Sequence, residues 1–218
     1  MGTPLIFQIS HYSILIAFLA SLIYFSYLST PVKYLAGLMI IGTFTEFAST
    51  AISGSNHWIM NLYDVVEFVF IMAIFYKYND VLKSKKILLS IMGIFVLSRI
   101  ILLTTNIESI FDFKSYMQIF GNLLMISLAI LSLNIHKKEN IDCNTDSKFW
   151  ILSGILLYIS ASFVVTIPIL IWGNAVIIKI YFIHAYANIT TNLIFAYAFF
   201  IEFRQNRPDS SKLVRNIS

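Results

Sequence analysis

Hydrophobic segments of about 20 residues recur along nearly the whole chain, and only short polar connections separate them. The hydrocarbon core of a bilayer is ~30 Å thick, so a helix that rises about 1.5 Å per residue needs about 20 apolar residues to cross it. Of the 218 residues, 58% are hydrophobic and only 12% are charged, whereas an average soluble domain carries ~25% charged residues. The sequence therefore predicts an all-α integral membrane protein.

Seven such segments can be drawn, which predicts a compact bundle of seven transmembrane helices. Their expected ranges are 10–30, 34–53, 58–77, 86–105, 115–135, 149–172 and 176–202. Because the connections are short, consecutive helices are expected to be antiparallel neighbours. We expect one transmembrane domain over residues 1–203 and a polar, mobile cytosolic tail over residues 204–218.

The basic residues are distributed unevenly between the two sides of this topology. Lys114 and Lys179 lie on one side, and Arg99 lies within a span. The other twelve of the fifteen Lys and Arg residues share the side of the C-terminus: Lys33, Lys77, Lys83, Lys85, Lys86, Lys137, Lys138, Lys148, Arg204, Arg207, Lys212 and Arg215. Basic residues favour the cytosolic side of a membrane. The N-terminus is therefore predicted outside and the C-terminus in the cytosol, in a multi-pass protein of the plasma (inner) membrane.

The formal charge of +4 is explained by this topology, so the predicted partners are the lipid bilayer and a small ligand, and no nucleic acid. Cys143 is the single cysteine of the chain, which excludes an intramolecular disulfide and a cysteine-based metal cage.

Four charged residues lie within the expected spans. Glu46, Asp64, Glu67 and Arg99 lie about 9–13 Å inward from the outer ends of their helices at ~1.5 Å per residue. A charged group at membrane depth costs ~2.5–3.5 kcal/mol even on the lower, insertion-based scale, and it therefore indicates a cavity, a partner or a bound proton. We expect these four side chains to share one polar layer, with Arg99 contacting at least one of the acids.

Uncharged polar residues extend this layer. Gln118 and Asn122 are spaced four residues apart on one face, and Tyr181, His184, Asn188 and Asn192 follow one stripe. The inner half of the spans is largely Leu, Ile, Phe and Ala, so we expect it to be dry and tightly packed. The asymmetry predicts a polar pocket in the outer half. The expected ligand-binding residues are Glu46, Asp64, Glu67, Arg99, Asn122, His184 and Asn188.

The alternative for the uncharged members is a purely structural role, because polar side chains between transmembrane helices often join neighbouring helices at ~0.6–2 kcal/mol each. The charged residues of the layer indicate more than a structural role. Three acids face one arginine, and uncompensated carboxylates in a low dielectric are costly, so they are expected to take up protons or bind a cation. Glu46, Asp64, Glu67 and His184 could in this way hold a divalent metal such as zinc.

A metal site of this kind resembles that of the intramembrane zinc hydrolases, the superfamily of alkaline ceramidases and adiponectin receptors. The resemblance lies in Ser53-Gly-Ser-Asn-His57 and in Asp64. It implies seven helices and zinc-dependent hydrolysis of a lipid. The last span departs from the pattern, since it reads His184-Ala-Tyr-Ala-Asn188 where that family has two histidines.

Three functions remain open on the sequence. The first is binding of a small polar or amphiphilic ligand by a receptor-like sensor or carrier, with Arg99 as an anion anchor and the acids as hydrogen-bond acceptors or protonated donors. The second is a metal-dependent intramembrane lipid hydrolase. The third is a structural or assembly subunit in which the polar layer only determines packing.

Overall fold

The structure is a computed structural model that describes residues 4–52, 57–78, 85–105, 116–139, 145–172 and 177–207. Within these ranges the chain is all-helical, as predicted, with seven α-helices and one short 3-10 helix. In order they are α1 (Leu5–Tyr24), η1 (Phe25–Tyr27), α2 (Thr30–Ala51), α3 (His57–Tyr78), α4 (Lys85–Thr104), α5 (Tyr116–Glu139), α6 (Ser147–Trp172) and α7 (Ile177–Asn206).

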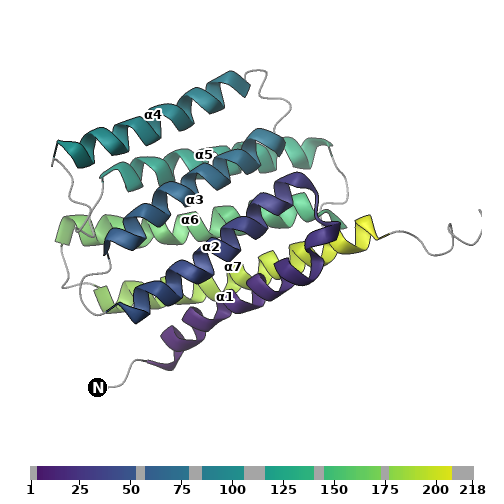
Figure 1. Cartoon of the computed structure of the whole chain (residues 1–218), viewed down its shortest axis with the longest axis horizontal. Helices are drawn as coiled ribbons and strands as arrows, with labels where there is room; N and C mark the ends of the chain where they lie inside the picture. Colours follow the sequence, from purple (N-terminus) through teal and green to yellow (C-terminus); the bar gives the residue numbers. More distant parts are fainter. Residues whose placement is uncertain are drawn as a thin grey trace, which may run out of the picture.

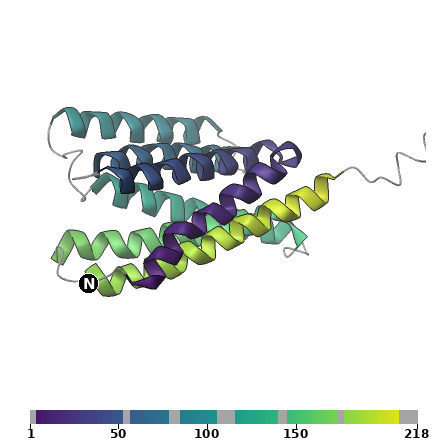
Figure 2. The ribbon, with the colours of Figure 1, turned by 60° about the horizontal axis from the view of Figure 1, so that its bottom comes forward.

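The helices lie roughly side by side and alternate in direction along the chain (Figure 1). Six of them form a closed ring in the order α1, α2, α3, α5, α6, α7 and back to α1, each packing against the next. The remaining helix, α4, packs on the outside of this ring against α3 and α5, and the turned view in Figure 2 places it at the edge of the molecule. Ring order therefore departs from chain order at α4.

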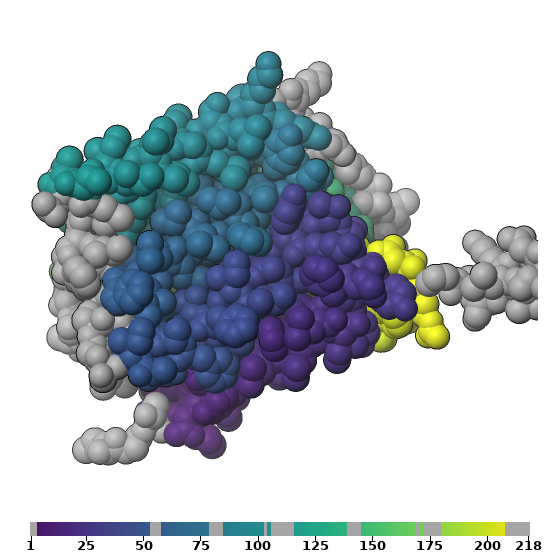
Figure 3. Space-filling model, viewed as in Figure 1, coloured from purple at the N-terminus to yellow at the C-terminus, as the bar shows by residue number. Residues whose placement is uncertain are grey.

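Aromatic stacking attaches α4 to the ring. The rings of Phe68 on α3 and Phe95 on α4 are stacked, with centroids 3.7 Å apart and planes 18° from parallel. Gly121 on α5 makes room for this pair, because a Cβ at that position would lie 2.9 Å from the Phe95 ring. Figure 3 shows side chains of α1 to α4 in close contact over this face of the molecule.

The contact between α6 and α7 also depends on a glycine. A Cβ on Gly154 would lie only 2.5 Å from the ring of Phe195, which is 3% exposed. The two helix backbones can approach this closely only because position 154 has no side chain.

Gly154→Ala is expected to lower the free energy of unfolding by about 1–3 kcal/mol, because overpacking forces Phe195 or the α7 backbone to move. Thermal unfolding of the purified protein in detergent measures this. Gly93→Ala on α4 is the matched control, since a Cβ there would meet nothing within 4 Å, and alanine favours a helix over glycine by about 1 kcal/mol. Equal melting temperatures for the two variants would contradict the expectation.

Among the residues that the structure describes, four helices are long and apolar enough to cross a membrane: Leu5–Tyr27, Trp58–Tyr78, Tyr116–Lys138 and Ser147–Pro168. This finding supports the prediction of a membrane protein with transmembrane helices, but it covers fewer than the seven spans expected. The hydropathy of α7 is lowered by polar residues such as His184, Asn188 and Asn192. The same residues that suggested a pocket thus make this helix less apolar.

Several element boundaries differ from the expected ones, and the largest shifts are at the two ends of the first helix. The first helix begins at Leu5 rather than at residue 10, and it ends at Tyr24, where η1 follows. In the sequence, Ser10 and His11 look like polar residues at the start of a membrane span. They lie within α1 instead, because their side chains form hydrogen bonds with residues of α7 and α2. At the other end of the chain, α7 continues to Asn206 and so includes the first three residues of the expected tail. The predictions for Cys143 and Ser53 concern positions outside the described residues.

Candidate functional site

A cavity of about 350 Å³ lies inside the six-helix ring. All six ring helices contribute to its wall, and α4 does not. The lining begins near the ends where α3, α5 and α7 start, and it extends past the middle of the bundle to Leu35, Ile71 and Ile155. The polar end of the cavity is therefore the end that the sequence predicts to face outward.

The predicted site residues divide into two groups. Glu46, Asp64, Glu67, His184 and Asn188 line the cavity, together with Gln118, Tyr181 and Asn192. Arg99 and Asn122 are not among the lining residues of this cavity. The fold thus brings three acids and a histidine from α2, α3 and α7 to the lining of one cavity, and the arginine of α4 is outside that lining.

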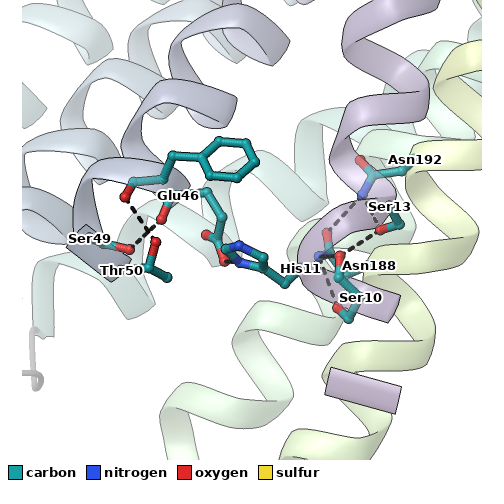
Figure 4. A network of polar contacts seen from close by, with 9 residues as sticks. Ser10, His11, Ser13, Glu46, Ser49, Thr50, Asn188 and Asn192 are labelled. Atoms are coloured by element: carbon teal, nitrogen blue, oxygen red, sulfur yellow. Dashed lines mark hydrogen bonds and ion pairs between the residues drawn. The ribbon is translucent and has the colours of Figure 1, made fainter. Parts of the chain in front are cut away.

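Glu46 pairs with a residue that sequence reasoning missed. The Nδ1 atom of His11 on α1 lies 2.7 Å from Glu46 Oε1, and the two side chains are 19% and 35% exposed. Figure 4 shows the imidazole reaching from α1 toward α2, and its ring packs edge-on against Phe47 with centroids 5.4 Å apart. A histidine inside an apolar segment could have indicated this contact. Because His11 is next to the expected start of the first span, the expected range places it near the membrane surface.

Two serine–asparagine pairs join α1 to α7. Asn188 Nδ2 donates to Ser10 Oγ at 3.1 Å, and Asn192 Nδ2 donates to Ser13 Oγ at 2.8 Å (Figure 4). These contacts match the structural alternative, in which polar side chains connect neighbouring transmembrane helices. Both asparagines also line the cavity, so the same side chains form part of its wall.

Glu67 lies at the centre of the polar wall. Its side chain is buried, with 8% of its surface exposed, and the Tyr158 hydroxyl on α6 donates a hydrogen bond to its carboxyl group. The other carboxyl oxygen, Oε1, is buried and has no hydrogen-bond partner among the described residues. Tyr158 in turn faces the His184 ring, with centroids 6.4 Å apart. Neither tyrosine of this wall, Tyr63 or Tyr158, was singled out from the sequence.

Arg99 is 4% exposed and donates a hydrogen bond of 2.8 Å to Asn61 Oδ1 on α3. Its positive charge also acts on the Asp64 carboxyl group by Coulomb interaction. Asn61 and Asp64 are three residues apart, on one face of α3. Arg99 is not among the residues that line the cavity, and the anion-anchor role that the sequence suggested stays a prediction. A direct contact between Arg99 and one of the three acids stays a prediction.

Asn122 lies beside a second, much smaller pocket of about 10 Å³, which Asp64, Glu67 and Gln118 also line. Its Nδ2 atom is buried without a hydrogen-bond partner among the described residues. Asn122 is therefore next to the acids but outside the main cavity.

The metal reading receives no support from the side-chain geometry. In the part of the chain that the structure describes, no three His, Cys, Asp or Glu side chains are grouped closely enough to hold a metal ion. His57 is the first residue of α3, but its side chain is outside the described part, as is Ser53. Glu46, Asp64, Glu67 and His184 line one cavity without forming a ligand set.

The opposite end of the bundle holds a polar cluster that was not expected from the sequence. Glu202 on α7 is 6% exposed; it accepts hydrogen bonds from the Ser147 hydroxyl, from the Ser29 backbone N–H at 3.1 Å and from Asn206 Nδ2 at 3.2 Å. The inner half is therefore not uniformly apolar. Sequence reasoning missed Glu202 because it lies at the end of the expected span, where an acid can reach water.

Comparison with known proteins gives no relative: no protein-family model, no curated protein and no solved structure matches this chain.

Proposed function

We propose that this protein is a seven-helix transmembrane protein that binds a small polar or amphiphilic ligand in the cavity of its six-helix ring, as a receptor-like sensor or a carrier. The cavity carries the proposal: its volume of about 350 Å³ lies within the ~300–1,000 Å³ typical of small-molecule sites. More than half of the residues that line it have polar side chains, and the others are apolar; convergent polar groups of this kind orient a ligand in small-molecule sites.

The lengths of the helices and their exposed apolar side chains support a topology of seven transmembrane spans. The helices outside the four most apolar ones, α2, α4 and α7, are 22, 20 and 30 residues long, which at about 1.5 Å per residue is enough to cross a core of ~30 Å. On α4, the side chains of Ile94, Leu97 and Ile101 are more than half exposed. An apolar surface of this kind is stable against lipid and costly against water.

Basic and aromatic residues at one end of the bundle support the orientation. Lys85 lies over the Tyr76 ring, Lys148 over Tyr78 and Arg207 over Phe203, at 5.4–5.8 Å from the ring centroids. Such pairs are typical of the membrane interface, where aromatic rings and long basic side chains meet the headgroups. The cavity lies toward the other end, which the excess of basic residues predicts to be outside.

A reporter fused after Ser218 should therefore show the C-terminus in the cytosol, and a reporter at the N-terminus should be outside. Paired fusions of an enzyme active only outside and a fluorescent protein active only inside measure this. A C-terminal reporter with the outside signal would place the cavity on the cytosolic side and overturn the orientation.

Ligand entry from outside can be tested with a single thiol in the cavity wall. Cys143 is the only cysteine and is expected to be dispensable, so Cys143→Ser supplies the background. Ser162 on α6 lines the cavity, and Ser162→Cys should react with a membrane-impermeant thiol reagent added to intact cells.

Leu152→Cys, two to three turns deeper on α6 at a fully buried position, should not react and is the matched control. Absence of labelling at Ser162→Cys, with labelling at the exposed Thr104→Cys on α4, would contradict an outward-open binding cavity.

A metal-dependent lipid hydrolase makes a different prediction, namely a stoichiometric divalent metal in the purified protein. Elemental analysis decides between the two functions. We favour ligand binding because the described His, Cys, Asp and Glu side chains form no group of three that could hold a metal.

A further inference from the structure

The acids of the cavity wall differ in how their charges are balanced. Glu46 is paired with His11 at 2.7 Å. Asp64 lies in the field of Arg99, whose guanidinium is buried next to Asn61. Glu67 receives only a hydrogen bond from the uncharged Tyr158 hydroxyl. Of the three acids, Glu67 is thus the one without a nearby positive charge among these described neighbours.

Glu67 combines a place on the cavity lining with an unpaired carboxyl oxygen. The residue lines the cavity and is more than nine-tenths buried. Its Oε1 atom has no hydrogen-bond partner among the described residues and is itself buried, not exposed to the cavity. Leaving a buried polar oxygen unpaired costs about 1–3 kcal/mol, and more for a charged group. A rotation of the carboxyl group toward the cavity would let a donor from a ligand remove this cost.

The rest of the wall suits the ammonium group of an organic molecule. The aromatic rings of Tyr63 and Tyr158 lie on the same wall, and aromatic faces attract cations. Deeper in the cavity the wall becomes apolar at Ile71, Ile155 and Phe195. A bare metal ion fits poorly, because the described acids and histidines form no group that could ligate it.

We propose that the ligand is a small organic cation, with its ammonium group at the carboxyl group of Glu67 and its apolar body against the floor formed by Ile71, Ile155 and Phe195. The inference rests on the proposed binding function and specifies its ligand class. Since Arg99 is not among the lining residues, an anionic ligand would meet the acids without a guanidinium to hold it.

The test uses the Ser162→Cys variant of the full chain in the Cys143→Ser background, in intact cells. Labelling rates are measured with two membrane-impermeant methanethiosulfonates of similar size, one bearing a quaternary ammonium and one bearing a sulfonate. The ratio of cation to anion rates is divided by the same ratio at the exposed Thr104→Cys. We expect this normalised ratio to be roughly 10 or more, because a charged cleft concentrates ions of opposite sign by ~10–10³-fold.

Glu67→Gln, which keeps an oxygen to accept the Tyr158 hydrogen bond, should bring the normalised ratio close to 1. Glu139→Gln, at the last residue of α5 on the opposite end of the bundle, should leave it unchanged. In the Ser162→Cys protein that retains Glu67, 2-phenylethylammonium should slow labelling, and the neutral 2-phenylethanol should not. This comparison needs no substitution at Glu67 and stands even if Glu67→Gln fails to fold.

Each other outcome overturns a defined claim. Equal rates for both reagents, or equal protection by the amine and the alcohol, would leave a binding cavity but remove its preference for cations. A cation preference that survives Glu67→Gln in a folded protein would remove Glu67 as its source. Absence of labelling by either reagent, with normal labelling at Thr104→Cys, would refute the open cavity and with it the proposed function.

Discussion

Replacing Arg99 with methionine should lower the free energy of unfolding by about 3–5 kcal/mol, the usual cost of removing one side of a buried charged contact. The guanidinium is 4% exposed and donates to Asn61 Oδ1 at 2.8 Å. Its removal takes away the hydrogen bond to the buried Asn61 side chain and withdraws the positive charge that acts on Asp64. Unfolding of the purified protein by increasing SDS in mixed micelles measures the change.

The second substitution identifies the acid coupled to Arg99. Removing both partners of a buried charge pair can be nearly neutral, so Arg99→Met combined with Asp64→Asn should recover part of the lost stability. Glu46→Gln should recover less, because Glu46 already has His11 as a partner. Recovery by Glu46→Gln alone, or an unchanged stability of Arg99→Met, would contradict the placement of Arg99 beside Asn61 and Asp64.

Glu202→Ala should also be strongly destabilising, by about 3 kcal/mol or more, because hydrogen bonds to a charged group contribute about 1.5–3 kcal/mol each. Three donors converge on this carboxylate: the Ser147 hydroxyl, the Ser29 N–H and the Asn206 amide. They come from the start of α6, the residue before α2 and the end of α7. Loss of the Glu202 carboxylate should therefore remove the hydrogen bonds that join these three elements at this end of the bundle. The same unfolding assay measures the resulting change in stability.

Gln205→Ala is the neighbouring control for Glu202. Gln205 is exposed and donates a single hydrogen bond of 2.7 Å to the Thr145 carbonyl, so its replacement should change stability little. Glu202→Gln should lie between the two, because an amide keeps one acceptor oxygen and loses the other. If Glu202→Ala were as stable as Gln205→Ala, the cluster would be a surface feature without a structural role.

Much of the candidate site could be predicted from the sequence because charged and polar residues in apolar segments are conspicuous. Asp64, Glu67, Glu46 and His184 were identified in this way, and all four line the same cavity. Arg99 was identified for the same reason, yet it is not part of that lining and belongs to the one helix outside the ring. The depth of Arg99 in the bundle follows from counting residues along its helix. Whether Arg99 reaches the cavity or the outer face of α3 depends on where α4 packs.

The sequence by itself determined the all-helical fold, the membrane character, the approximate helix ranges and the presence of acids at depth. These properties follow from hydropathy and helix geometry, which act locally along the chain. Only the tertiary structure decided which polar residues meet. His11 and Glu46 are 35 residues apart and Asn188 and Ser10 are 178 apart, and such pairs depend on the order of helices in the ring and on the rotation of each helix about its axis. Hydropathy specifies neither, because many arrangements bury the same apolar area, and packing of particular side chains selects among them.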